Sequence, residues 1–564
     1  MLKAITYVLL ILCLSAGQAS AGRDGDETFI IARNGSDEDA RYFVKTLVAN
    51  QTAEPGQTFY IEGNEGDLEI TTWDRSEIAV TGTLEMVNID RQNEELFDET
   101  SRIELEPYRD GYRLAVALPQ GLAIELKHLP SIIRGRIKMN DDGGVYWPMA
   151  KADLKVSLPR RMNLNLETSY GDVTVGELDG SVEVVNDSGA VEIADCRGPV
   201  EVETSYGSVT VGACPGDVMI RNDSGKVTLL DIGGDVTAYT SYETIDVQRV
   251  GGRVEIHNDS GEVRVSDTAG DVQVESSYES VSVTRAQGPV TIRCDSGDIT
   301  VDDVQADVDL IGGYNPITCS NITGKLNISG DSSRISCREV TGLVEIDGSY
   351  EPIDLSDIDG DVFVEGSSSE VSVIRVEGNA DIRSSYEGIT VEGVSGDCLV
   401  EAESSAVDVE GVGGETRIKS SYEMIKARAV AGALNIRGDS SPVLVEGVKG
   451  RVDVANSYEY VIVRGAESSI SIAANDCPVE ISQIAVLPDG ATYDVSTTYE
   501  RITLVLPPDV SAEILARTRD GDIKSAFPMQ IREDGVTRGE VTLGAGDCSI
   551  RLETSDDIYI KKGR

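Results

Sequence analysis

The sequence is poor in aromatic side chains and nearly lacks histidine. Only 5% of its 564 residues are Phe, Trp or Tyr, and its two histidines, His128 and His257, stand far apart. Asp-Ser pairs are common, but we find no histidine or lysine placed to activate a serine as a nucleophile. His257 lies on the polar side of a repeat turn, and we interpret it as a surface residue. We therefore expect a protein that is not an enzyme, without catalytic residues, cofactor or bound metal.

Long hydrophobic runs are missing after the first 21 residues. Lys3 carries a positive charge, residues 4–14 are apolar, and Ala19-Ser20-Ala21 is a small-residue cleavage site, so residues 1–21 are predicted to be a secretory signal peptide. Cys13 lacks the small residues that precede a lipoprotein cysteine. No later run reaches the roughly 18 residues of a membrane-spanning helix. We expect an exported protein (periplasmic, cell-surface or secreted) with no membrane-spanning segment.

Positive charge and cysteine are both scarce. The chain has 49 basic and 98 acidic residues, a formal net charge of −49, which disfavours binding to nucleic acid and to anionic membranes. Such acidity can indicate disorder, but 40% of the residues are hydrophobic and they recur in a regular order. Nine cysteines in a chain of this length are too few for a disulfide framework. We expect a folded, acidic protein.

What the sequence has instead is a strict internal repeat. Glycine recurs every 18 residues from Gly180 to Gly450, and Ala306 is the only break in that series. Tyrosine recurs at twice that interval, at Tyr170, Tyr206, Tyr242, Tyr278, Tyr314, Tyr350, Tyr386, Tyr422 and Tyr458. Periods of this length are typical of solenoid architectures.

Each 18-residue unit, called a rung below, contains two short strands. Apolar and polar residues alternate over residues 182–184 and again over 191–193, which indicates two strands with one buried face each. A fifth inward position, Cys196 in this rung, precedes the next glycine. Burying five such side chains gives roughly 10 kcal/mol, whereas ordering the rung's backbone costs roughly 18–36 kcal/mol. Rungs must therefore stack, and the predicted fold is an all-β, single-chain parallel β-solenoid (β-helix), right-handed by the general crossover preference.

The flanks of the repeat lose its period. We predict an N-terminal β-rich cap with the first irregular rungs over residues 22–155, the regular solenoid over 156–484, and C-terminal irregular rungs with a cap over 485–564. A basic patch lies between Lys127 and Lys138, and Tyr499 follows Tyr458 after 41 residues instead of 36. Irregular end rungs would keep open strand edges from pairing with other chains.

Three segments carry a family resemblance. They are Gly66-Asp67-Leu68-Glu69-Ile70 with Trp73-Asp74 near the start, Val156-Ser157-Leu158-Pro159 leading into residues 164–173, and Leu506-Pro507 through residues 520–523 and 552–558 at the end. On these motifs the chain resembles the bacterial putative-adhesin family of β-strand-repeat domains of unknown function. The resemblance implies a β-repeat fold and adhesion as the function, and it brings no catalytic residues.

These observations favour a non-enzymatic adhesin or surface-binding protein of the bacterial envelope. Its candidate partner is a glycan or a surface matrix, and the sequence does not predict its oligomeric state. The alternative is a passive envelope scaffold or spacer without a ligand. A polysaccharide-active β-helix enzyme is disfavoured, because the rungs from Gly180 to Gly450 contain no insertion that could form a cleft.

The tyrosine row has two interpretations. Serine takes the equivalent place in the intervening rungs, so each ring could pack over its neighbour's turn, and we favour this interpretation. Alternatively, the rings form an aromatic comb that stacks on glycan. A matching row of aspartates, Asp187, Asp223, Asp259, Asp295 and Asp331, has members two rungs apart, roughly 10 Å, which is too far to share one metal ion.

Two pairs of cysteines stand one rung apart. Cys196 and Cys214 form one pair, and Cys319 and Cys337 form the other. Stacking in adjacent rungs would put their Cα atoms about 5 Å apart, within the range of a disulfide. The sequence leaves open whether each pair is bridged or packs as two thiols.

Overall fold

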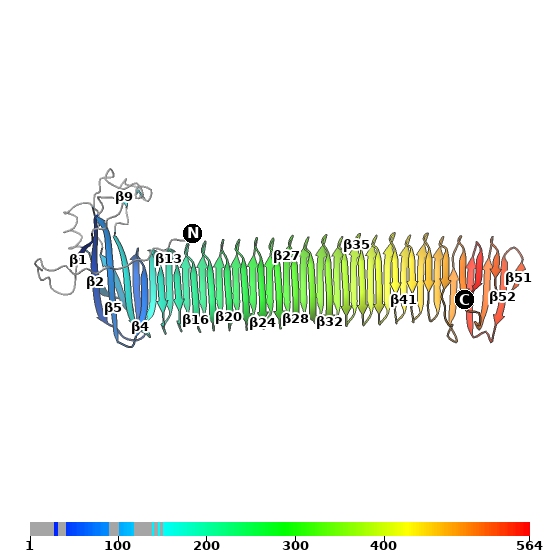
Figure 1. Cartoon of the computed structure of the whole chain (residues 1–564), viewed down its shortest axis with the longest axis horizontal. Helices are drawn as coiled ribbons and strands as arrows, with labels where there is room; N and C mark the ends of the chain where they lie inside the picture. Colours follow the sequence, from blue (N-terminus) through cyan, green and yellow to red (C-terminus); the bar gives the residue numbers. More distant parts are fainter. Residues whose placement is uncertain are drawn as a thin grey trace, which may run out of the picture. The chain divides into compact units, whose positions relative to one another are not determined.

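The computed structural model describes residues 28–31, 41–88, 101–117, 138–139, 145–146 and 150–563 (Figure 1). Within these ranges the regular elements are all β-strands, and no helix there could span a membrane. The predicted signal peptide 1–21, Cys13, His128 and all of the basic patch except Lys138 lie outside the described residues. Two compact units, residues 1–178 and 179–564, are described separately below.

The first unit combines antiparallel and parallel strand pairs. In one sheet β1, β2, β5 and β10 pair antiparallel in that order, and β4 pairs parallel with both β10 and β12. In the other sheet β3 pairs parallel with β7 and β11, and β6 pairs antiparallel with β7. The strands are β1 (Thr28–Ile31), β2 (Arg41–Thr52), β3 (Thr58–Asn64), β4 (Leu68–Trp73), β5 (Glu77–Asn88), β6 (Arg102–Tyr108), β7 (Gly111–Ala117), β8 (Lys138–Met139), β9 (Val145–Tyr146), β10 (Ala150–Pro159), β11 (Asn163–Tyr170) and β12 (Val173–Gly176).

The second unit is a rod in which the chain alternates between two parallel sheets (Figure 1). The odd-numbered strands form one sheet: β13 (Val182–Ser188), β15 (Val200–Thr204), β17 (Val218–Asn222), β19 (Val236–Thr240), β21 (Val254–Asn258), β23 (Val272–Ser276), β25 (Val290–Cys294), β27 (Val308–Gly313), β29 (Leu326–Asp331), β31 (Val344–Ser349), β33 (Val362–Ser367), β35 (Ala380–Ser385), β37 (Cys398–Glu403), β39 (Thr416–Ser421), β41 (Leu434–Asp439), β43 (Val452–Ser457), β45 (Ile470–Asn475) and β47 (Thr492–Ser496).

The even-numbered strands form the facing sheet: β14 (Val191–Ala194), β16 (Val209–Cys214), β18 (Val227–Ile232), β20 (Ile245–Val250), β22 (Val263–Thr268), β24 (Val281–Ala286), β26 (Ile299–Val304), β28 (Ile317–Thr323), β30 (Ile335–Thr341), β32 (Ile353–Asp359), β34 (Val371–Val376), β36 (Ile389–Val394), β38 (Val407–Val412), β40 (Ile425–Arg428), β42 (Val443–Glu446), β44 (Val461–Arg464), β46 (Val479–Ser482) and β48 (Ile502–Leu506).

Strand register confirms the predicted parallel β-solenoid with 18-residue rungs. Val182 of β13 lies opposite Val200 of β15, and Val200 lies opposite Val218 of β17, each 18 residues further along. Each strand therefore bonds to its own equivalent in the next rung, and Val stacks on Val inside the rod. The five inward positions of the first rung, Val182, Val184, Val191, Ile193 and Cys196, are at most 1% exposed. The handedness of the coil stays a prediction.

One turn of each rung is built on the repeated glycine. A Cβ atom added to Gly198 would lie 2.3 Å from the carbonyl oxygen of Gly180 in the neighbouring rung, closer than any side chain tolerates. The residue after the glycine fastens the same turn. Asp217 Oδ1 accepts the backbone N–H of Asp235 at 2.9 Å, and Asp235 Oδ1 accepts that of Arg253 at 2.8 Å. Repeated Gly-Asp pairs thus join successive turns.

Near the end of each even strand from β14 to β46 one residue adopts a left-handed conformation. These residues interrupt the alternation of the strand, so that inward side chains stand two and then three residues apart, as at Val209, Val211 and Cys214. Most are not glycine, and the non-glycine members have φ between 53° and 58°. They are Asp195, Ala213, Asp231, Arg249, Asp267, Arg285, Asp303, Asn321, Glu339, Asp357, Arg375, Gly393, Gly411, Ala429, Gly447, Gly465 and Gln483.

The eight cysteines among the described residues are buried inside the rod. Cys319 and Cys337 stand opposite each other in β28 and β30, as predicted, and both are buried thiols. Cys319 and burial together raise the pKa of Cys337 well above its usual value. The Cys196 thiol donates to the Ala194 carbonyl at 3.5 Å, and its side chain lowers the pKa of the Cys214 thiol. Of the two alternatives left open by the sequence, the structure has the packed thiols.

The C-terminal end reverses the simple order of rungs. Its strands are β49 (Ala512–Thr518), β50 (Ile523–Ser525), β51 (Gln530–Glu533), β52 (Thr537–Leu543), β53 (Cys548–Thr554) and β54 (Ile558–Lys562). β53 lies between β47 and β49, and β54 lies between β48 and β50. The last rung in the sequence, made of β53 and β54, is therefore inserted between the rung of β47 and β48 and the rung of β49 and β50. β52 and β51 then close one sheet as antiparallel strands. Upstream, a five-residue offset pairs Ile470 with Tyr493.

Insertion of one residue after Val290 is expected to lower the free energy of unfolding by at least about 3 kcal/mol, because it shifts β25 against both neighbours and turns inward side chains outward. Insertion after Val486 is the control, since this residue is 72% exposed in the loop that already interrupts the 18-residue period. Urea unfolding followed by circular dichroism measures both variants. Equal loss of stability would contradict a solenoid held by register.

Asp557 fastens the inserted last rung to β50. Its Oδ1 accepts the Asp522 N–H at 2.8 Å, and its Oδ2 accepts from Lys524 Nζ and from the Tyr559 hydroxyl, each at 2.8 Å. Led by the bond from Lys524, these contacts lower the pKa of Asp557 to about 2. A lowered folded-state pKa adds stability above the unfolded pKa of about 4, and this contribution disappears as pH falls toward 2.

We therefore expect β49 and β50 to lose hydrogen-exchange protection, relative to the intrinsic exchange rate at each pH, between about pH 4 and pH 2 and before the central rungs do. Asp557→Asn should produce part of this loosening at neutral pH. The control is Asp534→Asn, since Asp534 is an exposed residue of the same cap. Hydrogen exchange read by mass spectrometry locates the change, and equal exchange in both variants would show that Asp557 does not hold the end rung.

Candidate binding surface

The tyrosines of the row lie in the turns that lead from an odd strand to the next even strand, in every second rung. Eight of these tyrosines belong to the rod, and their side chains are 62–73% exposed: Tyr206, Tyr242, Tyr278, Tyr314, Tyr350, Tyr386, Tyr422 and Tyr458. Each stands two rungs from the next, which at the usual spacing between strands is about 9.5–10 Å. The row therefore offers eight aromatic rings over about 65–70 Å of one edge of the rod.

Five of these tyrosines sit in strained turns. Tyr314, Tyr350, Tyr386, Tyr422 and Tyr458 have φ between 67° and 72°. In each turn the residue after the tyrosine donates its N–H to the carbonyl of the residue before it, at 2.8–3.0 Å. This bond and the positive φ are those of a classic γ-turn, a rare and strained conformation. A positive φ is especially unfavourable for a bulky side chain.

The neighbouring rungs hold this conformation in place. The Tyr350 N–H donates to the Ser367 carbonyl at 2.9 Å, and the Tyr386 N–H donates to the Glu403 carbonyl at 2.8 Å. In the intervening rungs Ser368 and Ser404 have φ of 60° and 55° at the equivalent position. The ladder thus imposes a left-handed residue on every rung of this segment, and every second rung uses the position to point a tyrosine into solvent.

The favoured interpretation of this row, that each ring packs over its neighbour's turn, is wrong. Side chains that pack in this way would be largely covered, whereas Tyr206 is 73% and Tyr350 is 68% exposed. The alternation of Tyr with Ser suggested packing because a large and a small residue commonly interlock. Exposed rings in strained turns instead fit a surface that presents aromatic groups.

The first three of the eight tyrosines differ from the other five in their backbone conformation. Tyr206, Tyr242 and Tyr278, all among the described residues, are not in the left-handed region. Their turns lie next to turns held by side chains, as where Asn222 Nδ2 donates to the carbonyls of Gly207 and Gly225 at 3.1 and 2.8 Å. The first three and the last five tyrosines therefore present the same ring on two different turn geometries.

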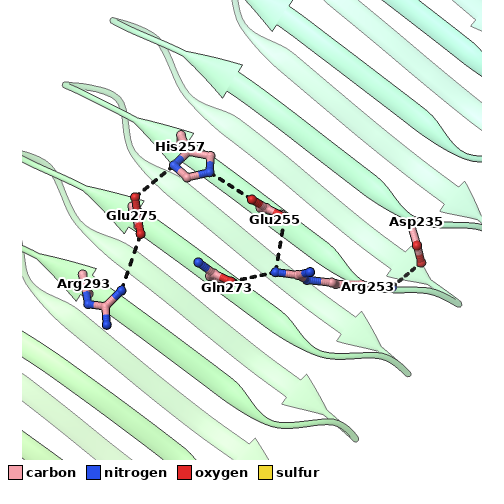
Figure 2. A network of polar contacts seen from close by, with 7 residues as sticks. All are labelled: Asp235, Arg253, Glu255, His257, Gln273, Glu275 and Arg293. Carbon is pink, nitrogen blue, oxygen red and sulfur yellow. Dashed lines mark hydrogen bonds and ion pairs between the residues drawn. The ribbon is translucent and has the colours of Figure 1, made fainter.

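A polar network surrounds His257 on the outer face of the odd-strand sheet (Figure 2). His257 of β21 lies between two carboxylates, with Nδ1 3.0 Å from Glu275 and Nε2 3.2 Å from Glu255. Its ring stacks on Tyr239 of β19 at 5.0 Å between centroids, with 4° between the planes. The residue predicted to lie beside a turn is thus on a strand, half-buried, in contact with three other side chains.

The network continues through two arginines, one directly before β21 and one on β25. Arg253 lies 3.2 Å from Glu255 and donates to Gln273 at 2.7 Å, and Arg293 lies 3.5 Å from Glu275 (Figure 2). All of these side chains remain partly exposed, so each ion pair contributes little to stability. The polar partners of His257 among the described residues are carboxylates and no nucleophile. The network joins neighbouring strands, and its chemistry is that of a structural contact.

A second charged row follows the left-handed residues of the even strands. Arg249 donates to both oxygens of Asp231 at 2.5 and 3.0 Å, and Arg285 donates to both oxygens of Asp267 at 2.6 and 2.7 Å. These bonds lower the pKa values of Asp231 and Asp267 and raise those of the two arginines. Each pair joins two adjacent rungs, the two pairs stand two rungs apart, and both brace the edge opposite the tyrosine row.

The described residues offer little that could enclose a small molecule or an ion. A shallow depression of about 280 Å³ lies on the odd-strand sheet between Phe363 and Leu399, above Asp381. Within the described ranges no group of three His, Cys, Asp or Glu side chains is placed to hold a metal. The tyrosine row is therefore the most extensive candidate surface in this part of the chain.

Comparisons with known proteins add little to this picture. No family model matches the chain, and no curated protein matches it. Among solved structures, the crystal structure of "a putative cell adhesion protein" from Clostridium sporogenes matches with 7% sequence identity and a TM-score of 0.12, over 57% of this chain and 99% of that chain. This is a weak resemblance of one β-solenoid to a protein with that description.

Replacing Tyr350, Tyr386 and Tyr422 together with asparagine is expected to leave the free energy of unfolding unchanged or to raise it by about 1 kcal/mol, because asparagine tolerates positive φ better. The matched control replaces Tyr206, Tyr242 and Tyr278, whose backbone is not left-handed, and should show no gain. Thermal unfolding followed by circular dichroism measures both triple variants. A marked loss of stability in the first would mean that the rings are packed after all.

Proposed function

We propose that the protein is an exported, non-enzymatic adhesin that binds a linear glycan along its tyrosine row. The observation that carries this proposal is the set of exposed rings in strained γ-turns. Backbone strain persists where the surrounding structure over-determines it, and it is concentrated at functional sites. Here the strain is repeated at a fixed interval, and it is not offset by burial of the ring.

Regular spacing favours a polymer as the ligand. Tyrosine rings stack on the apolar faces of sugars, and each such contact is weak. Eight rings on one edge would engage successive parts of one chain, so that the second and later contacts form within a complex and avidity replaces affinity. A small molecule would contact only one ring, and the regular spacing of the rings would then play no part in its binding.

Three further points support the proposal. The N-terminal segment 1–21 has the pattern of a secretory signal peptide, the chain resembles the putative-adhesin family at its start and end, and the acidic surface disfavours nucleic acid and anionic membrane as partners. A passive envelope spacer is the alternative, and it would require no exposed aromatic row.

The test replaces Tyr242, Tyr278, Tyr350 and Tyr386 with serine, which the neighbouring rungs already carry. Adhesion to glycan-coated surfaces should fall by at least about tenfold, since lost contacts multiply through avidity, while circular dichroism and the melting temperature stay nearly unchanged. The control replaces Ile311 and Val486 with serine, because these exposed apolar residues lie outside the row. Equal adhesion of both variants, or no adhesion by the unmodified protein, would contradict a tyrosine-based adhesin.

A further inference from the structure

Each tyrosine in most of the row is followed by an exposed glutamate. The pairs are Tyr242-Glu243, Tyr278-Glu279, Tyr350-Glu351, Tyr386-Glu387, Tyr422-Glu423 and Tyr458-Glu459, and both members of each pair are exposed. In the last four the glutamate N–H closes the γ-turn by donating to the residue before the tyrosine. The same turn therefore fixes where the tyrosine side chain and the glutamate side chain leave the backbone.

Charge along this edge has one sign in the second half of the rod. The turns between residues 349 and 460 contain no lysine or arginine at the positions that flank the rings. They contain the exposed acids Glu351, Glu370, Glu387, Glu403, Glu423, Asp439 and Glu459. Most arginines of this segment pair with other carboxylates instead, as Arg428 does with Glu410 and Arg451 with Asp453. Asp439 accepts from the Ser457 hydroxyl, whereas the six glutamates of these turns form no ion pair with another described residue, so their carboxylates are available to a ligand.

We propose that the row binds a cationic amino-polysaccharide whose repeat is a disaccharide. An aromatic ring beside a carboxylate matches a sugar that carries an ammonium group, since the ring takes the apolar face and the carboxylate takes the charge. An extended β-1,4-linked glycan repeats after two sugars, close to the two-rung interval of about 10 Å. Every second sugar would then meet the same ring and carboxylate.

This inference rests on the proposed function and narrows its ligand. Anionic polymers such as sulfated glycans are disfavoured by the run of carboxylates, and neutral glycans would use the rings but not the glutamates. Salt should weaken the preference for the cationic chain, because pairs between exposed charges are screened. The tyrosine rings stack on the sugars, and the glutamate carboxylates make the surface prefer a cationic chain over a neutral or anionic one.

The experiment compares β-1,4-linked octamers of glucosamine, N-acetylglucosamine and glucose, which share one backbone and one repeat. Calorimetry in a slightly acidic buffer, where the glucosamine amines are protonated, gives the three affinities for the unmodified protein. We expect the glucosamine octamer to bind at least about tenfold more tightly than the two neutral octamers. Raising the salt concentration should reduce this ratio.

Two variants separate the roles of the two residue types. Replacing Glu351, Glu387, Glu423 and Glu459 with glutamine should bring the three octamers to similar affinity, whereas replacing the preceding tyrosines with serine should weaken all three. The control carries glutamine at exposed glutamates elsewhere on the rod and should keep the preference: Glu339, Glu365, Glu392 and Glu467.

Each outcome decides something. Equal binding of charged and neutral octamers by the unmodified protein, or tighter binding of a neutral one, would overturn the amino-polysaccharide and leave glycan adhesion standing. Absence of binding by all three would overturn the amino-polysaccharide and count against the proposed adhesin as well. Persistence of the tenfold preference in the glutamine variant would assign the discrimination to other residues and overturn the role given to the glutamates.

Discussion

The whole rod depends on backbone hydrogen bonds between equivalent residues of adjacent rungs. Because each strand bonds to its own equivalent 18 residues away, every position in the rung stacks on itself, and one residue type suits the whole column. Valine fills the inward columns, glycine fills the column where backbones approach too closely for a Cβ atom, and aspartate carboxylates accept the N–H groups of the next turn. The sequence repeat is the consequence of this self-stacking.

The same ladder lets the rod hold backbone conformations that an isolated chain would avoid. A left-handed residue costs about 1–2 kcal/mol, yet the even strands carry one in nearly every rung at residues such as Asp231, Arg249 and Arg375. Bonds to the rungs above and below leave no alternative path for the chain. Backbone strain is therefore distributed along two edges of the rod. At one edge the left-handed residues lie near the ends of the even strands, and at the other they include the tyrosines of the row.

The fold could be predicted from the sequence because its signals are local and repeated. Alternation within each strand and the glycine interval determine strands, register and stacking together. The left-handed residues could not be predicted in this way, since aspartate, arginine and tyrosine carry no signature of positive φ comparable to glycine's. The contacts of His257 were also missed, because stacking on Tyr239 depends on which outward columns become neighbours.

The candidate surface shows the same division. The tyrosine row and its period were evident from the sequence, but the alternation with serine is equally compatible with buried and with exposed rings. Exposure follows from the place of the tyrosine in the turn between the two sheets, since Tyr206 without the γ-turn is as exposed as Tyr350 with it. At the C-terminal end the insertion of β53 and β54 left no local trace either, because strand order within a sheet is not encoded in the pattern of any one strand.

That insertion has a consequence for how the chain is made. A solenoid can add rungs in chain order as an exported chain emerges from the membrane, each rung on the one before. Here the residues of β49 and β50 emerge earlier than those of β53 and β54, which lie between them and the rest of the rod. The rung of β49 and β50 must therefore wait until β53 and β54 have followed and taken their places beneath it. A chain that stops before β53 keeps an open end on the rung of β47 and β48.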